Sequence, residues 1–202
     1  MPKARTKEKQ VLDLARAAGI LRLTDLTEKG IHPEHLRRLH QKGLLVRIGR
    51  GVYTLSEASV SGNFTLAEVT KKVPRSVICL LSALRFHEIG TQSPPDVWIA
   101  LDRKAARPQI NSPRLRVMRF SDAAFSSGVE THRIDGVSVR IYCSAKTVVD
   151  CFKYRNKIGL DVALEALRDC RRRRTCTIDD LWKYAKICRV ANVMRPYLEA
   201  IA

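Results

Sequence analysis

The stretch from Pro33 to Leu55 restricts the fold of this chain more than any other segment. It opens with a short basic run of helix formers, ends that run at Gly43, and continues into two apolar runs separated by Gly49-Arg50-Gly51. Proline suits the first turn of a helix, because its fixed φ is helical and its missing N–H has no partner there. Glycine suits both the end of a helix and a tight turn between strands. The segment therefore predicts a helix followed directly by a β-hairpin with an arginine at its tip.

Two further helices are predicted ahead of that segment. Residues 7–18 carry apolar side chains at helical spacing before Gly19, and residues 25–29 follow Thr24, a favourable N-cap. Three short helices followed by a hairpin are typical of a winged helix-turn-helix, in which one helix enters the major groove of DNA. We therefore predict a winged helix-turn-helix DNA-binding domain over residues 1–58.

The third predicted helix has an apolar face and a polar face. Leu36 and Leu39 lie on the same side of a helical wheel, so they are expected to pack on the first two helices. The opposite side carries arginine and glutamine, which can bind the edges of guanine and adenine. The hairpin adds arginines beside glycines that allow close approach to phosphates. The predicted DNA-binding residues are Arg37, Arg38, Gln41, Lys42, Arg47 and Arg50.

The charge of the whole chain favours a polyanionic partner. Lys and Arg number 37 against 20 Asp and Glu, which gives a formal net charge of +17. Nucleic acid is the commonest partner of such a positive field. A basic N-terminal arm is expected to add phosphate or minor-groove contacts through Lys3, Arg5, Lys7 and Lys9. The alternative is a protein-interaction module that does not contact DNA and whose basic helix is simply solvated.

No membrane, metal or cofactor function is indicated by the sequence. No apolar run approaches the ~20 residues that span a bilayer. The N-terminus does not lead into the apolar region of a signal peptide, so a cytoplasmic protein is expected. The six cysteines contain no C-x-x-C pair, which argues against a zinc site or a disulfide framework and favours reduced, mostly buried thiols.

A second domain is predicted beyond the small, polar stretch at residues 56–63, and it covers residues 63–202. The pattern there predicts helices at Phe64–Val73 and Ser76–Ile89, strands at Asp96–Leu101 and Leu115–Phe120, and a hairpin turning at Asp135-Gly136. The remainder is predicted to be helical, with a capping box from Thr177 to Asp180 and a kink or a break at Pro196. The predicted fold class is α+β: an N-terminal winged helix-turn-helix followed by a mixed α+β domain with a helical C-terminal end.

Several long runs resemble a known family. The run LARAAGILRLTDLTEKGIHPEHLRRLHQKGLLVRIGRGVYTL resembles the N-terminal winged-helix domain of AbiEi-family antitoxins. The runs VPRSVICLLSALRFHEIG, PPDVWIAL and SAKTVVDCFKYRNKIGLDVALEALRD resemble the C-terminal domain of the same family. The resemblance extends from about Gln10 to about Tyr197.

This resemblance implies a role in a toxin–antitoxin system. Proteins of the AbiEi family bind inverted repeats in their own promoter, so paired copies on double-stranded DNA and autorepression are expected. The resemblance also implies that the C-terminal domain counteracts an AbiEii-type nucleotidyltransferase toxin. The DNA contacts transfer only to the predicted residues named above, and the family supplies no short catalytic motif to transfer.

Two enzymatic alternatives are weaker. A nucleotidyltransferase needs a Gly-Ser loop followed by an Asp-x-Asp pair for Mg²⁺, and the chain has neither. A metal-dependent nuclease could use Asp96, Asp102 and Lys104, but these would lie along one strand, about 26 Å from end to end at ~3.3 Å per residue. Only a turn after Leu101 would bring them together.

The run Arg171–Arg174 has two interpretations. It could oppose an acidic partner or add a second DNA contact. The simpler interpretation is a solvated helix end, where cations complement the helix dipole.

Overall fold

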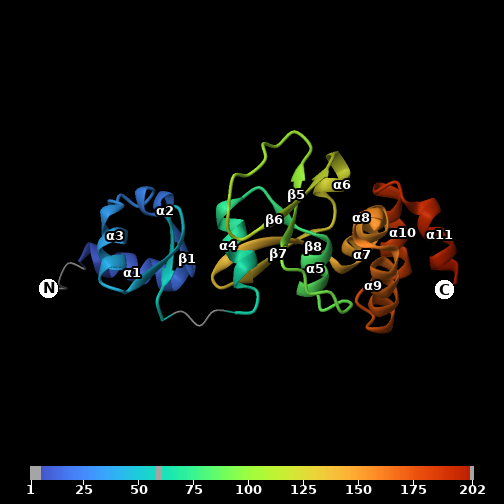
Figure 1. Ribbon diagram of the computed structural model, residues 1–202, viewed down its shortest axis with the longest axis horizontal. Coiled ribbons are helices and arrows are strands. Elements are labelled where there is room, and N and C mark those ends of the chain that lie inside the picture. Colours follow the sequence, from blue (N-terminus) through green and yellow to red (C-terminus); the bar gives the residue numbers. More distant parts are fainter. Residues whose placement is uncertain (1–5, 58–60, 201–202) are drawn as a thin grey trace. The chain divides into compact units, whose positions relative to one another are not determined.

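The computed structural model describes residues 6–57 and 61–200 (Figure 1). The chain divides into two compact units, the first formed by residues 1–74 with 133–139 and the second by residues 75–132 with 140–202. Helices and strands alternate at the N-terminal end, and the C-terminal end is helical, so the predicted mixed α+β class is confirmed. Among the described residues, no helix combines the length and the apolar character needed to cross a bilayer.

The first unit begins with three helices and a small antiparallel sheet. The sheet has the strand order β1-β3-β2, with β3 antiparallel to both neighbours. Along the chain the elements are α1 (Lys7–Ala18), β1 (Ile20–Arg22), α2 (Leu23–Thr27), α3 (Glu34–Gln41), β2 (Leu45–Gly49), β3 (Val52–Leu55) and α4 (Phe64–Lys72).

Local signals define the ends of the first helix. The hydroxyl of Thr6 accepts a hydrogen bond from the backbone N–H of Lys9 at 3.4 Å, which satisfies one of the unpaired donors of the first turn. Gly19 ends the helix with φ at +67°, a backbone angle that residues with a Cβ rarely adopt. The helix then buries Val11 and Ala15 completely, in one cluster with apolar residues of α2 and α3.

The remaining strands of the chain form a five-stranded sheet. Its strand order is β6-β5-β4-β8-β7, in which β5 runs parallel to β6 and antiparallel to β4, and β4 runs parallel to β8. The strands are β4 (Val77–Ile78), β5 (Val97–Asp102), β6 (Leu115–Phe120), β7 (Val129–Ile134) and β8 (Val137–Tyr142). The helices are α5 (Leu80–Phe86), α6 (Asp122–Ser126), α7 (Ser144–Lys153), α8 (Arg155–Ile158), α9 (Leu160–Arg172), α10 (Ile178–Ile187) and α11 (Ala191–Glu199).

Helix α7 lies at the centre of the second unit's core. Residues 145–152 are all buried, and the apolar ones among them pack in one cluster with residues of α5, α9, α10 and α11. Two of the buried residues are charged: Lys146 Nζ lies 2.5 Å from Asp150 Oδ2, one helical turn away, and both side chains are 0% exposed. The ammonium also lies 4.1 Å from the ring centroid of Tyr142, a favourable cation–π distance. The core therefore contains a buried ion pair, which is stabilised by the contact between the two charges and by the ring of Tyr142.

Several predicted elements are confirmed. Asp135 and Gly136 both have positive φ, +45° and +79°, as a type I′ turn requires between β7 and β8. Thr177 and Asp180 form the capping box that starts α10. Both strands predicted between residues 96 and 120 are present within one residue of the expected bounds.

Other predictions are corrected. Residues 76–79 do not begin a helix, because Val77 and Ile78 form a two-residue strand, and Ile78 pairs with both β5 and β8. Pro196 lies inside α11 without dividing it. The expectation of reduced cysteines throughout is wrong for Cys170 and Cys176, which are joined by a disulfide, whereas the other four are free.

The buried ion pair predicts an asymmetric response to mutation. Asp150→Asn leaves the ammonium of Lys146 buried without a counter-charge, so we expect it to lower the free energy of unfolding by about 3–5 kcal/mol. The double variant Lys146→Met, Asp150→Leu removes both charges and should recover most of that loss. Urea unfolding at neutral pH measures both effects. A loss of less than about 1 kcal/mol for Asp150→Asn, the range of exposed pairs, would contradict this account.

Candidate nucleic-acid interface

Helix α3 is fixed in rotation by two leucines. Leu36 and Leu39 are 0% and 1% exposed and lie in the cluster that includes Val11 and Ala15 of α1. Residues at positions i and i+3 share a helix face, so burying these two side chains turns the opposite face outward. The structure therefore gives α3 the apolar and polar faces that the helical wheel predicts.

The outward face of α3 carries Arg37, Arg38 and Gln41, all exposed. Arg38 Nε lies 4.0 Å from Glu34 Oε1, but both side chains are largely in water, so this contact holds the guanidinium only weakly. Arg37 and Gln41 have no hydrogen-bond or ion-pair partner among the residues that the structure describes. Of the groups predicted to bind base edges, Arg38 alone has an internal contact with a described residue, and that contact is weak.

Lys42 differs from these residues. Its ammonium donates to both carboxylate oxygens of Glu8 on α1, at 2.9 and 2.7 Å. The hydrogen bond from Lys42 lowers the pKa of Glu8, so the pair is charged at neutral pH. An anionic ligand would have to compete with Glu8 for this lysine. Sequence inspection missed the pairing, because nothing local connects residues 8 and 42.

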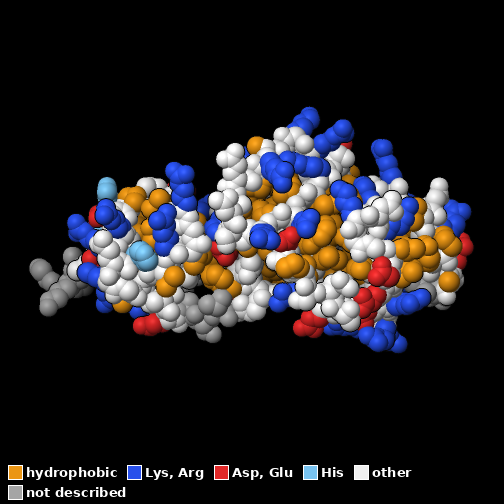
Figure 2. All heavy atoms as spheres, in the orientation of Figure 1, with side chains coloured by type: hydrophobic (Ala, Val, Ile, Leu, Met, Phe, Trp, Pro, Cys, Tyr) orange, Lys and Arg blue, Asp and Glu red, His pale blue; other side chains and the backbone are white. Residues whose placement is uncertain are grey.

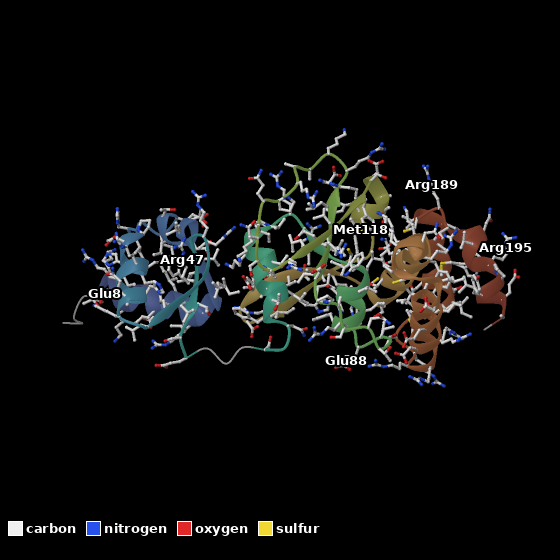
Figure 3. All side chains as sticks on the ribbon, in the orientation of Figure 1. Glu8, Arg47, Glu88, Met118, Arg189 and Arg195 are labelled. Atoms are coloured by element: carbon white, nitrogen blue, oxygen red, sulfur yellow. A yellow bond between two sulfur atoms is a disulfide. The ribbon has the colours of Figure 1, made fainter. Side chains whose placement is uncertain are left out.

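The β2–β3 hairpin presents the other two predicted residues (Figure 3, where Arg47 is labelled). Gly51 has φ at +70°, which suits a tight turn next to Arg50. Arg47 is exposed, and its Nε donates to the carbonyl of Gly49 at 3.1 Å, which keeps the side chain along the hairpin. Arg50 is exposed at the turn and has no side-chain partner within the described ranges.

A lysine of helix α4 contacts the backbone of this hairpin. Lys72 Nζ donates to the carbonyl of Ile48 at 3.2 Å and lies 2.6 Å from Glu68 Oε1. A Cβ on Gly49 would lie 2.5 Å from Cε of Lys72, so the glycine gives the lysine room. The space beside Gly49, predicted to admit a phosphate, is therefore occupied by Lys72.

A second lysine of α4 binds the start of α2. Lys71 Nζ lies 3.1 Å from Asp25 Oδ2, and the same carboxylate accepts the backbone N–H of Arg22 at 2.9 Å. Burial opposes ionisation of Asp25, but the hydrogen bonds from Arg22 and Lys71 outweigh it and lower the pKa of the carboxyl. These contacts connect α2 to α4, and sequence inspection did not anticipate them.

The other basic residues singled out in the sequence differ in exposure and in pairing. Of the predicted N-terminal arm, Lys3 and Arg5 lie outside the described residues, whereas Lys7 and Lys9 are exposed on α1. In the run Arg171–Arg174, Arg172 is paired with Asp169, and Arg173 binds the carbonyl and the carboxylate of Glu88. Half of that run is thus used inside the second unit.

The nuclease residues are not assembled into a site. Asp96 immediately precedes β5 and Asp102 ends it, so six residue steps of ~3.3 Å place them about 20 Å apart. Asp96 accepts a 2.8 Å hydrogen bond from Arg116, and Asp102 accepts the backbone N–H of Lys104 at 2.8 Å. Within residues 6–57 and 61–200, no three His, Cys, Asp or Glu side chains lie close enough together to hold a metal ion.

Comparisons with known proteins agree with the resemblance seen in the sequence. The family model described as transcriptional regulator, AbiEi antitoxin, matches residues 9–56, which confirms the resemblance over this segment. No curated protein matches the chain. Among solved structures, the chain is similar to the crystal structure of the RV2827C protein from Mycobacterium tuberculosis. The TM-score is 0.58 at 17% identity, and the match covers 91% of this chain and 72% of the other, so it shows a shared fold alone.

The contact between α2 and α4 predicts a pH-dependent contribution to stability. Asp25→Asn should lower the free energy of unfolding by about 1 kcal/mol at neutral pH, at the low end for charged hydrogen bonds because the site is partly exposed. The folded pKa of Asp25 is lowered, so this contribution is present above its unfolded pKa of about 3.9 and is lost as the pH falls through the folded pKa.

Thermal unfolding of wild type and variant from neutral to acidic pH measures this effect. Glu28→Gln, which removes an exposed carboxylate without an ion pair described in the structure, serves as the matched control. A stability difference between wild type and Asp25→Asn that stays constant down to the lowest pH would contradict the assignment.

Proposed function

We propose that this chain is a DNA-binding transcriptional autorepressor and an antitoxin of the AbiEi type, with residues 1–58 forming a winged helix-turn-helix. In this proposal α3 is the recognition helix and the β2–β3 hairpin is the wing. The observation that carries the proposal is the outward face of α3, where Arg37, Arg38 and Gln41 are exposed above two buried leucines. The match of residues 9–56 to the AbiEi antitoxin regulators supports it independently.

The exposed side chains of α3 carry groups that can bind the edges of DNA bases. A guanidinium can donate two hydrogen bonds to O6 and N7 of guanine, and a glutamine amide can pair in the same way with adenine. Arg37 and Gln41 are free to do this without breaking an internal contact, and Arg38 gives up only its weak contact with Glu34. Lys42 contributes less, because Glu8 neutralises it.

The wing binds phosphate in this proposal. Arg50 lies at the turn and Arg47 lies along β2, and both side chains are exposed. Such contacts position the domain on the duplex and carry no sequence information themselves. They also make binding strongly dependent on salt, because each neutralised phosphate releases condensed counterions.

Paired copies on an inverted repeat give the affinity that one small domain lacks. Two copies contacting about 6–10 phosphates would lose about 10³–10⁵ in affinity between 50 and 200 mM salt. We further propose that residues 63–202 form the domain that counteracts an AbiEii-type nucleotidyltransferase toxin in the cytoplasm. No catalytic step is assigned to the chain, and its partners are double-stranded DNA and the toxin.

The helix assignment predicts the effect of removing two arginines. Arg37→Ala combined with Arg38→Ala should abolish specific binding to the DNA upstream of the protein's own gene. The base contacts are lost, whereas the buried leucines still maintain the fold. Gel shifts at 150 mM salt measure binding, and circular dichroism checks the fold. The matched control is Lys7→Ala combined with Lys9→Ala, which removes the same charge from α1 and should weaken binding only modestly. Specific binding retained by the double arginine variant would refute the recognition helix.

The two proposed activities are separable. The same Arg37→Ala, Arg38→Ala variant should lose repression of its promoter yet still rescue the growth of cells that express a cognate AbiEii-type nucleotidyltransferase. A promoter reporter and a growth assay in the same host measure the two outcomes. Loss of rescue by a variant that is folded and equally abundant would contradict the assignment of antitoxin activity to residues 63–202.

A further inference from the structure

The tip of the β7–β8 hairpin belongs to the first unit. Residues 133–139, which we call the hairpin tip, are far from residues 1–74 in the sequence, yet the two segments form one compact unit. Ile134, Val137 and Val139 are 7%, 4% and 0% exposed, so the hairpin tip is packed and does not simply extend into water. The sequence assigned these residues to the second domain.

An arginine of the hairpin tip binds the last turn of helix α1. Nη2 of Arg133 donates a hydrogen bond to the carbonyl of Ala17 at 3.3 Å. The last carbonyls of a helix have no partner within it, so a donor from outside stabilises this end. A cation here also complements the negative end of the helix dipole. In addition, Ser61 Oγ donates to Asp135 Oδ2 at 2.6 Å, which connects the hairpin tip to the segment before α4.

The turn of the hairpin tip also lies against the turn between α1 and β1, backbone to backbone. A Cβ on Gly19 would lie 1.6 Å from the carbonyl oxygen of Asp135. A Cβ on Gly136 would lie 2.7 Å from the carbonyl carbon of Ala18. Non-bonded heavy atoms pack at about 3.5–4.0 Å, so the two turns can approach this closely only because both glycines lack a side chain. We call this approach the corner contact.

The corner contact is connected to both elements of the proposed DNA interface. The backbone N–H of Gly19 donates to the carbonyl of Ala15 at 2.9 Å. Ala15 is 0% exposed and packs in the cluster that includes Leu36 and Leu39 of α3. The hydroxyl of Thr54, on β3, donates to the carbonyl of Gly19 at 3.0 Å, and β3 pairs with β2 in the hairpin proposed as the wing. A displacement of Gly19 would therefore affect both α3 and the wing.

We propose that the hairpin tip is a positioning segment for DNA recognition, which holds the corner between α1 and β1 so that α3 and the wing keep the arrangement that reads bases. The inference rests on the proposed function, in which α3 is the recognition helix. The hairpin tip acts without touching DNA itself. Base contacts need side chains held within about 0.5 Å of the productive geometry, so the support of the recognition helix decides whether they form.

The corner can shift when this support is lost. An open cavity of about 260 Å³ lies beside the corner contact and is bordered by Gly19, Thr54, Phe64 and Asp135. Protein interiors contain few voids larger than a water molecule, and such dense packing would hold a turn from all sides. Because this corner borders a cavity, the hairpin tip supplies a larger share of its support. Displacing the hairpin tip is therefore expected to move the corner without unfolding the unit.

Loss of the corner contact should affect specific binding selectively. Phosphate contacts depend on charge and carry no sequence information. Lys and Arg side chains are spread over the visible surface of α1 to α3 in Figure 2, and a substitution at a glycine leaves all of them in place. A displaced hairpin tip should therefore lower the preference for the operator and leave binding to arbitrary duplex DNA unchanged. A contact that only stabilises the fold would not change the ratio of the two affinities.

The test compares Gly19→Ala with Gly30→Ala in the full-length protein. The two glycines have similar φ, +67° and +64°, so alanine brings similar backbone strain to both. A Cβ on Gly30 meets nothing within 4 Å, whereas a Cβ on Gly19 collides with Asp135. Gly19→Ala should bind the DNA upstream of the protein's own gene about tenfold more weakly at about 150 mM salt, as a mismatched base pair does. Its affinity for arbitrary duplex DNA and its salt dependence should not change, because no cation is lost. Gly30→Ala should match the wild type on both duplexes.

Arg133→Leu is a second variant that decides the question if Gly19→Ala does not fold. It removes the donor to the carbonyl of Ala17, so it should also lower the preference for the operator. Arg133→Lys keeps both a donor and the charge and should restore that preference. Fluorescence anisotropy measures the affinities, and circular dichroism checks the fold.

Wild-type preference for the operator in folded Gly19→Ala, or an equal loss in Gly30→Ala, overturns the inference. An equal loss on both duplexes overturns it as well, because it indicates a structural role alone, and so does an equal preference in Arg133→Leu and Arg133→Lys. If Arg37→Ala with Arg38→Ala abolishes operator binding while Gly19→Ala binds normally, the positioning role fails and the proposed function stands. A wild-type protein that binds the operator no better than arbitrary DNA would refute both.

Discussion

The burial of Leu36 and Leu39 against α1 is the interaction on which the proposed interface depends. Burying a leucine side chain contributes about 1.5–3 kcal/mol, so rotating α3 to expose both would cost about 3–6 kcal/mol. The surface ion pair between Arg38 and Glu34 contributes at most about 1 kcal/mol. The core therefore decides which way α3 faces, and the arginines take the outward positions that remain.

Predictions from the sequence succeeded where the signal was local. Pro33 and Gly43 lie beside the ends of α3, Asp135-Gly136 forms the turn between β7 and β8, and Thr177 caps α10. The failure at Val77 and Ile78 has a physical cause, since a short apolar run does not distinguish a strand from the start of a buried helix. Their pairing with β5 and β8, which tertiary structure supplies, decided the outcome.

The candidate site was only partly predictable, because some of its contacts join residues that are far apart in the sequence. The exposed arginines of α3 follow from helical periodicity, but Lys42 is bound by Glu8, 34 residues away. Asp25 and Lys71 are 46 residues apart, and their contact connects α2 to α4. The net charge counts every cation equally, whereas the structure distinguishes cations without an internal partner among the described residues, such as Arg37, from cations paired within the protein, such as Lys42 and Arg172.

The central claim is that α3 enters the major groove, and chemical protection of guanine N7 by the bound protein tests it most directly. Dimethyl sulfate methylates N7, which faces the major groove, so guanines in both halves of the repeat should be protected by the wild-type protein. Arg37→Ala should lose protection at one position per half-site while the others persist. A complex that protects the sugar–phosphate backbone from hydroxyl radicals yet leaves every guanine N7 reactive would contradict the account.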